Sequence, residues 1–197
     1  MRLLFAITAL TLLSVSRAAP MQCEVSVKQL ILEDFTPILG KWIFLEGTAD
    51  HQKHESILKL VNSSWVEFLP TSYDDTVTFN QGNMINGKCL HESFNLTFVN
   101  NTFTVTHENA TSSGILLHTC PDCLLVMFSS FYPEGTIRSF YILGKAKELS
   151  ITDLETYRRQ SECQGFPKAP FIYDGQSEFC PPKQEITASE DPDNVKH

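Results

Sequence analysis

The sequence has few basic residues and, after its first residues, no long hydrophobic run. Its 197 residues contain 15 Lys and Arg against 23 Asp and Glu, which gives a formal net charge of −8. A surface this acidic disfavours nucleic acid and anionic membranes as partners and is compatible with cationic ligands. No segment after residue 18 approaches the roughly 20 apolar residues that a membrane-spanning helix needs. We therefore expect no nucleic-acid partner and no membrane span.

Sequence signatures of common enzyme classes are also missing. There is no G-x-S-x-G, no H-E-x-x-H and no phosphate-binding glycine loop. The six histidines show no tight metal-ligand spacing except His51 and His54, which lie in a polar segment, 50–55, that we interpret as a loop rather than a site. Asp74 and Asp75 fit turn chemistry better than a catalytic pair. The sequence thus predicts no enzyme, no metal site and no cofactor.

One segment, Cys120-Pro121-Asp122-Cys123, is a redox candidate. In thioredoxin-like proteins C-x-x-C begins a helix, whose N-terminus lowers the thiol pKa. Here the segment lies between two strand-like runs with no helix in prospect. A zinc site that also uses His118 would lack a fourth ligand. We therefore predict a local disulfide at the end of a hairpin.

The N-terminus has the layout of a secretory signal peptide. A basic start at Arg2 precedes an apolar run of roughly 11 residues, and small residues follow it. We expect cleavage after Ala18, with Ala19 as the alternative, and a secreted, extracellular protein. Residues 1–18 are then the signal peptide, 19–182 the folded domain and 183–197 an acidic, disordered tail.

Cysteines and glycosylation sequons fit this compartment. An even number of cysteines in an oxidising environment predicts three disulfides, although 15 pairings are possible. The six cysteines are Cys23, Cys89, Cys120, Cys123, Cys163 and Cys180. Four N-x-S/T sequons predict exposed, glycosylated asparagines. These are Asn62, Asn95, Asn100 and Asn109.

Short strand-like runs and turn residues alternate through the middle of the chain. The runs cover 40–47, 65–69, 76–81, 88–98, 103–107, 114–120, 124–132 and 136–143. Eight strands joined by short connections are typical of an all-β, up-and-down antiparallel barrel or of a sandwich. An eight-stranded barrel has an interior just wide enough for side chains alone or for one small ligand.

The sequon at Asn95 orients one of these strands. A glycan cannot lie inside a barrel, so odd-numbered positions in this run face outward. The outward residues are then Cys89, His91, Ser93 and Thr97, and the inward ones are Leu90, Phe94, Leu96 and Phe98. This orientation exposes Cys89 to a segment that lies against the outer wall.

After residue 144 the spacing of apolar residues changes from the period of a strand, two residues, to that of a helix, 3.6 residues. Ser150 and Asp153 resemble a capping box at a helix start, and Gly165 followed by Pro167 ends the helix. Residues 164–182 are aromatic and extended, with a cysteine at each end, Cys163 before them and Cys180 within them. We expect one helix packed outside the barrel, followed by a tied C-terminal extension.

The first strand carries a G-x-W motif followed by an acidic residue. Period-two alternation puts Trp42, Phe44 and Glu46 on one face of this strand. If Gly40 and Trp42 form the floor of a barrel, Glu46 points into its interior, where its carboxylate could pair with a cationic ligand. The alternative is that Glu46 lies at the rim of the barrel and is exposed to solvent.

This combination of motifs resembles the lipocalin family. Within the family it is similar to the orosomucoid branch, including its fish toxin-binding and tributyltin-binding members, with apolipoprotein M more distant. The similar segments are 40–42, 61–67, 81–89, 108–111, 120–123 and 163–180. The resemblance implies bridges Cys23–Cys163 and Cys89–Cys180, which leaves Cys120–Cys123.

The resemblance also implies a monomeric plasma carrier of small hydrophobic or amphipathic, often cationic, molecules such as lipids, xenobiotics or toxins. Ser139 and Tyr141 match a pocket Ser-x-Tyr of that branch, whereas Gln81 stands where the branch has a pocket glutamate. The expected ligand site comprises Phe44, Glu46, Gln81, Phe94, Ser139 and Tyr141. Two other classes stay open: an enzyme with a cavity cysteine, and a glycosylated protein-binding modulator without an obligatory ligand.

Overall fold

The computed structural model describes residues 27–107, 110–133 and 135–183. The expected signal peptide, Cys23, Asn109 and nearly all of the expected acidic tail lie outside these ranges. Within the described part of the chain, no helix is long and apolar enough to cross a membrane.

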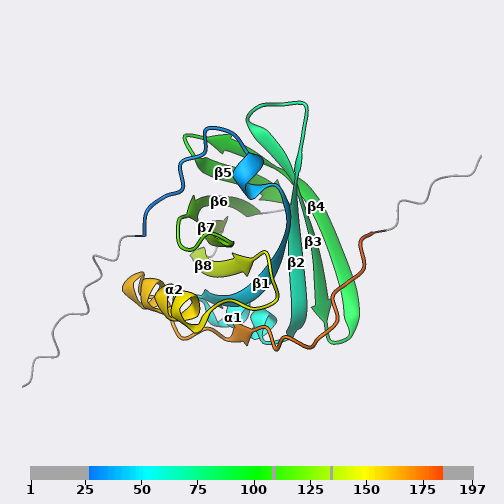
Figure 1. Ribbon diagram of the computed structural model, residues 1–197, viewed down its shortest axis with the longest axis vertical. Coiled ribbons are helices and arrows are strands. Elements are labelled where there is room, and N and C mark those ends of the chain that lie inside the picture. The colour runs from blue at the N-terminus through cyan, green and yellow to red at the C-terminus, as the bar shows by residue number, and fades with distance from the viewer. Residues whose placement is uncertain (1–26, 108–109, 134, 184–197) are drawn as a thin grey trace, which may run out of the picture.

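Eight antiparallel strands close into a barrel (Figure 1). They are β1 (Gly40–Ala49), β2 (Val61–Pro70), β3 (Thr76–Ile85), β4 (Lys88–Val99), β5 (Thr102–His107), β6 (Ala110–Leu117), β7 (Cys123–Tyr132) and β8 (Gly135–Gly144). Each strand pairs with the next, and β1 pairs with both β8 and β2, which closes the ring. The expected barrel is confirmed over the sandwich. The sixth strand, β6, covers Ala110–Leu117 and so begins and ends earlier than the run expected at 114–120.

One end of the barrel is closed by a short 3-10 helix, η1 (Thr36–Ile38), at the top of Figure 1. Trp42 is buried there and donates its indole N–H to the carbonyl oxygen of Ile38 at 2.7 Å. The ammonium group of Lys145 lies 3.8 Å from the Trp42 ring centroid and donates to the carbonyl of Leu39. Trp42 therefore lies at the floor, as expected from the G-x-W motif. We call this the η1 end.

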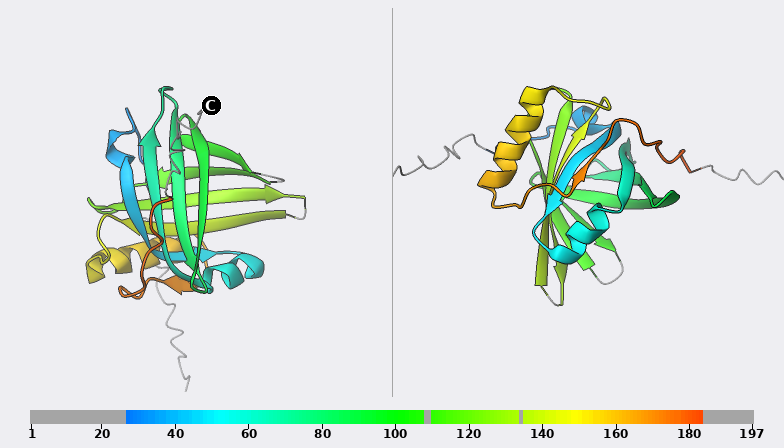
Figure 2. Two further views of the ribbon diagram at one scale, coloured as in Figure 1. Left: turned by 90° about the vertical axis from the view of Figure 1, so that its right-hand side faces the viewer. Right: turned by 90° about the horizontal axis from the view of Figure 1, so that it is seen from below.

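The opposite end carries a helix that the sequence analysis missed. Residues 50–55 were expected to be loop, but α1 (Gln52–Leu58) forms there, with the His51 ring capping it by accepting from the backbone N–H of Lys53. Leu58 is the one buried residue in this seven-residue helix, so no apolar periodicity signals it. The view from below in Figure 2 shows α1 at this end, which we call the α1 end.

A second helix, α2 (Ile151–Cys163), packs outside the barrel, as expected (Figure 1). Its N-cap Ser150 accepts from the backbone N–H of Asp153, which is the predicted cap. Tyr157 anchors α2 on β8, because its hydroxyl donates to the carbonyl of Phe140 at 3.0 Å and the two rings stack. The chain then adds a short strand, β9 (Phe171–Ile172), to β1.

Disulfides fix the C-terminal extension. Cys89 on the outer face of β4 is bonded to Cys180, as the resemblance implied, and Trp65 of β2 donates its indole N–H to the Cys180 carbonyl. The expected Cys120–Cys123 bridge is also present. Cys163 is disulfide-bonded, and its implied partner Cys23 lies outside the described residues.

A β-bulge in β1 changes which residues face inward. Phe44 pairs with Leu143 of β8 and Glu46 pairs with Ile142, so Leu45 has no partner on β8. An extra residue shifts the alternation by one. Trp42 and Phe44 face inward before the bulge, but Glu46 faces outward after it. The expectation that Glu46 points into the interior is therefore wrong.

Candidate functional site

The strand register defines an aromatic inner wall on β1, β7 and β8. The ring centroid of Tyr141 lies 4.8 Å from that of Phe44 and 5.1 Å from that of Phe128. A Cβ on Gly47 would lie 2.8 Å from Tyr141 and closer still to Phe44, so glycine leaves the space that these rings occupy. Phe171 of β9 stacks on Phe44 and completes this wall.

Two hydroxyl groups on this wall differ in their partners. The Tyr141 hydroxyl lies 3.0 Å from Nε2 of His54 on α1, whereas the buried Ser139 hydroxyl makes no well-formed hydrogen bond in the described part of the chain and interacts only weakly with the neighbouring Tyr141 hydroxyl. Burial raises the pKa of Tyr141 to about 12, so the phenol is neutral near pH 7; the nearby Ser139 hydroxyl opposes part of this rise. An unpaired buried hydroxyl is costly, so the Ser139 hydroxyl would gain from a ligand that supplies a partner.

His54 joins α1 to this inner wall. Burial is the main cause that lowers its pKa, and the neighbouring His51 adds to the effect. The neutral imidazole is therefore favoured near pH 7, and it can donate to or accept from the Tyr141 hydroxyl. Both α1 and this contact lie at the α1 end, where a ligand would meet polar groups first.

A second inner wall is formed by β2, β3 and β4. Phe79 and Phe94 pair across β3 and β4, and their rings stack with centroids 5.1 Å apart. Phe68 meets the edge of Phe79 at 5.3 Å. The next inward pair toward the α1 end is Gln81 with Glu92, in which the Gln81 amide donates to a Glu92 carboxylate oxygen. The inward orientation predicted for Phe94 is confirmed.

Together the two walls enclose an apolar, largely aromatic interior with a few polar groups. The structure brings together the expected Phe44, Ser139 and Tyr141 on one wall, and Gln81 and Phe94 on the other. Such a lining can hold the apolar body of a small molecule and orient it by hydrogen bonds. No group of three or more potential metal ligands occurs among the described residues.

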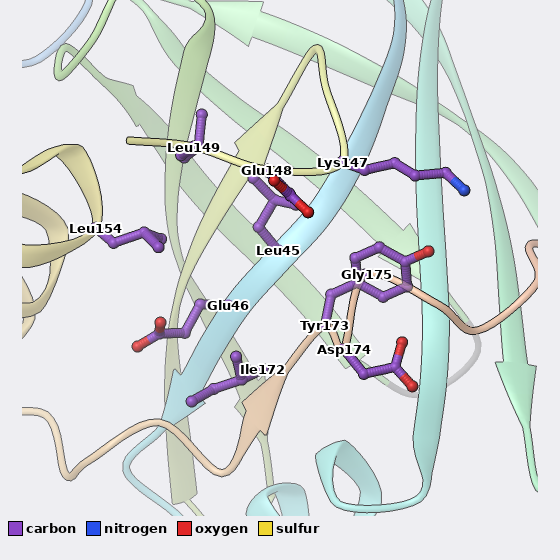
Figure 3. Close-up of a pocket in the computed structure, with 10 residues that line it drawn as sticks. All are labelled: Leu45, Glu46, Lys147, Glu148, Leu149, Leu154, Ile172, Tyr173, Asp174 and Gly175. Carbon is purple, nitrogen blue, oxygen red and sulfur yellow. The ribbon is translucent and has the colours of Figure 1, made fainter. Parts of the chain in front are cut away.

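Glu46 does not belong to this interior. Its carboxylate is buried under α2 and accepts hydrogen bonds from the Arg158 guanidinium, the shortest at 2.8 Å. Figure 3 shows Glu46 directed toward the Leu154 side of an outer groove of about 220 Å³, between α2 and β9. Since Arg158 already neutralises the carboxylate, Glu46 is a structural ion pair rather than a cation site.

The sequons lie on other surfaces. Asn62, Asn95 and Asn100 are exposed, on β2, on β4 and in the turn after β4. The outward orientation inferred from the Asn95 sequon is confirmed by the strand register. Their glycosylation remains a prediction.

Sequence reasoning missed two residues of the site, His54 and Glu92. His54 was assigned to a loop because α1 is too short to show a pattern. Glu92 lies on the same face of β4 as Phe94, so the parity set by Asn95 could have placed it inward. No local signal connects His54 with Tyr141, because 87 residues separate them.

Comparison with curated proteins finds distant relatives in the pufferfish Takifugu pardalis. The chain is 25% identical over 188 residues to saxitoxin and tetrodotoxin-binding protein 1, and 24% identical to saxitoxin and tetrodotoxin-binding protein 2. In each case the match covers 83% of this chain and 46% of the relative. The chain thus spans about half the length of these relatives. No protein-family model matches the chain.

Solved structures share the architecture at low sequence identity. Lipocalin 12 from rat epididymis has a TM-score of 0.65 at 17% identity, covering 80% of this chain and 94% of that one. The siderocalin Ex-FABP has a TM-score of 0.63 at 9% identity, covering 73% and 98%. A dog lipocalin allergen has a TM-score of 0.59 at 16% identity, covering 74% and 98%. The protein therefore has the lipocalin fold and is a distant homologue of the pufferfish toxin-binding proteins.

Proposed function

We propose that the protein is a secreted, extracellular carrier that holds one small hydrophobic or amphipathic molecule, such as a lipid, xenobiotic or toxin, inside its barrel. The lipocalin fold and the toxin-binding names of its distant relatives support this proposal. We also propose that it acts as a monomer in plasma and belongs to the orosomucoid-like branch, as the sequence resemblance implies.

The observation that carries the proposal is the aromatic inner wall with the poorly paired hydroxyl of Ser139 on it. Ser139 is 1% exposed, and its oxygen makes no well-formed hydrogen bond in the described chain, with only a weak interaction with the Tyr141 hydroxyl. A buried hydroxyl left wholly without a partner costs about 1–3 kcal/mol, and a weak partner offsets part of this. Its neighbours Phe44, Phe128 and Tyr141 supply apolar surface around it. A ligand with an apolar body and one hydrogen-bonding group matches this combination.

Binding rather than catalysis fits the cysteine chemistry. The enzyme alternative requires a cavity thiol, but all five cysteines in the described ranges form disulfides. A disulfide sulfur is no thiolate nucleophile. We therefore propose a carrier without enzymatic activity.

The experiment compares two tryptophan substitutions on β7. Val126 faces the interior and Ser129 faces outward, three residues further along the same strand. The reporter is N-phenyl-1-naphthylamine, a neutral dye that fluoresces in apolar sites. We expect wild type to bind about one dye per chain, Val126→Trp to weaken binding at least about tenfold by filling the interior, and Ser129→Trp to leave it unchanged. Near-ultraviolet circular dichroism checks that both variants fold.

If both variants lose dye binding, or if both keep it, the dye binds somewhere other than the interior. Absence of dye binding to wild type would remove the proposal and favour the protein-binding modulator.

A further inference from the structure

We propose that α1 is an acid-sensitive lid on the entrance to the barrel, which stays in place while His51 and His54 are neutral and opens when both are protonated. A ligand carried at neutral pH would then be released in mildly acidic surroundings. This inference rests on the proposed carrier function and adds a condition for release of the ligand.

The position of α1 makes it suitable as a lid. It joins the end of β1 to the start of β2, and the views in Figure 2 show it at the α1 end of the barrel. His54 of α1 reaches Tyr141, whose ring lies on the aromatic inner wall. The helix therefore covers the part of the entrance that adjoins this wall.

Few contacts hold α1 on the barrel. Leu58 is its one buried residue, and within the described ranges the contact of His54 with Tyr141 is the one side-chain hydrogen bond that joins α1 to a strand. A helix of seven residues is too short to be stable by itself in water. A segment held by so few contacts opens at a low cost in free energy, so a change at one or two of its side chains can release it.

His51 stabilises the first turn of α1 as its N-cap. Its ring Nδ1 accepts a hydrogen bond from the backbone N–H of Lys53 at 3.3 Å. A protonated imidazole carries a hydrogen on both ring nitrogens and cannot accept this bond. Its positive charge would also lie at the positive end of the helix. Protonation of His51 therefore removes the cap and destabilises α1.

His54 is partly buried where α1 meets the inner wall. Burial is the main cause that lowers the pKa of His54, and His51 adds to the effect. A protonated His54 could still donate to the Tyr141 hydroxyl, but its charge would then be partly buried. By linkage, the docked position of α1 is favoured while His54 is neutral and loses this advantage as the pH falls below the ordinary value of 6.5.

Neighbouring charges do not compensate a proton on His54. The charged or titratable side chains closest to His54 in sequence or by contact are Asp50, His51, Lys53, Glu55, Arg138 and Tyr141. Asp50 is paired with Arg138 of β8 at 2.6 Å, and the Tyr141 phenol is neutral because burial raises its pKa to about 12. Lys53 and Glu55 flank His54 with opposite charges, and no carboxylate of the described residues forms an ion pair with it. Protonated His51 and His54 would repel each other within the first turn of α1.

The test measures the affinity for N-phenyl-1-naphthylamine, which is uncharged in neutral and mildly acidic solution, at about pH 7.5 and about pH 5. The proteins are wild type, the double variant with His51→Asn and His54→Gln, and the control His118→Gln. Asn is a good N-cap and Gln can hydrogen-bond to Tyr141, but neither side chain titrates. His118 is an exposed histidine that follows β6 at the η1 end, so the control removes a histidine far from α1.

We expect acid to weaken dye binding about fivefold in wild type and in His118→Gln, because both keep the two histidines of α1. In the double variant the affinities at the two pH values should agree within about twofold. Hydrogen exchange of the α1 amides without dye, corrected for the intrinsic effect of pH, should be faster in acid in wild type and unchanged in the double variant. Near-ultraviolet circular dichroism at both pH values checks that the barrel stays folded.

Acid release of equal size in all three proteins, or none in wild type, would overturn the lid and leave the carrier function intact. Corrected exchange of the α1 amides that does not depend on pH in wild type would do the same, whether or not the double variant folds. Unfolding of the whole barrel in acid would also overturn the lid, because release would then have another cause. Absence of dye binding to wild type even at neutral pH would overturn the carrier function and the lid together.

Discussion

Glu46 is 2% exposed, and both of its carboxylate oxygens accept hydrogen bonds from the Arg158 side chain. The guanidinium itself is about half exposed, with 48% of the side-chain surface accessible. Removing only the arginine would leave a buried carboxylate without a partner, which is the costly way to break such a pair. This ion pair attaches α2 to β1, although its two residues are 112 positions apart in the sequence.

We predict that Arg158→Ala lowers the free energy of unfolding by about 2 kcal/mol, because a charged hydrogen bond to a buried group is lost. Urea unfolding followed by circular dichroism measures this. Arg159→Ala is the control, since Arg159 is exposed and its hydrogen bond, to Thr156, stays within α2. Equal stability of the two variants would contradict the structural role, and weaker binding of N-phenyl-1-naphthylamine by Glu46→Gln would contradict the exclusion of Glu46 from the site.

One side chain, His54, connects α1 to the inner wall of the barrel. Its ring contacts Tyr141, and burial lowers the pKa of His54 below its ordinary value of 6.5. The folded protein therefore binds a proton at His54 less readily than the unfolded chain does. By linkage, this contribution to stability is complete above 6.5 and is lost as the pH falls below 6.5.

We predict that the stability advantage of wild type over His54→Gln is larger at about pH 7.5 than at about pH 5. The difference between the two proteins removes the titration of groups that do not interact with His54. Urea unfolding at both pH values measures it. An advantage that is constant, or that grows in acid, would show that His54 is not held neutral by the fold.

The C-terminal extension is a second element with a defined attachment. The Cys89–Cys180 bridge closes a separation of 91 residues, whereas Cys120–Cys123 closes one of 3. The extension also covers Trp65, which lies over Gly82; a Cβ at Gly82 would come within 2.6 Å of the indole. The long bridge therefore restricts the unfolded chain far more than the short one and keeps Trp65 covered.

We predict that replacing Cys89 and Cys180 by serine lowers the free energy of unfolding by about 3 kcal/mol, and that replacing Cys120 and Cys123 costs clearly less. Trp65 emission should shift to the red only in the first variant, because its indole loses the cover of the extension. Emission spectra and urea unfolding test both statements. If the emission of Trp65 is not shifted to the red in the first variant, the extension stays in place without its disulfide.

Taking the whole molecule, alternation and turn residues were sufficient to predict eight strands. They left a barrel and a sandwich open, and the closed barrel was expected only from the resemblance to the lipocalins. The Ser150 cap and the glycine and proline after α2 likewise marked the outer helix. These signals are local, so they can be read from neighbouring residues. The sequon at Asn95 also predicted correctly which residues of β4 point outward and which point into the barrel.

The site was less predictable because its decisive features are not local. A one-residue bulge at Leu45 reverses the facing of Glu46, and nothing in the alternation of β1 reveals it. The partners of Glu46 and Tyr141 come from α2 and α1, far away in sequence. Glu92, by contrast, was accessible by parity, because Asn95 determines which face of β4 points inward.

The central claim is that the barrel interior, and not the outer groove beside α2, binds a small organic molecule. A crystal structure of the protein with N-phenyl-1-naphthylamine tests it most directly. We predict one molecule inside the barrel, with its rings against the aromatic side chains of the inner walls, Phe79 and Phe94 among them. A molecule seated only in the outer groove near Ile172, with the interior filled by the protein's own side chains, would contradict the account.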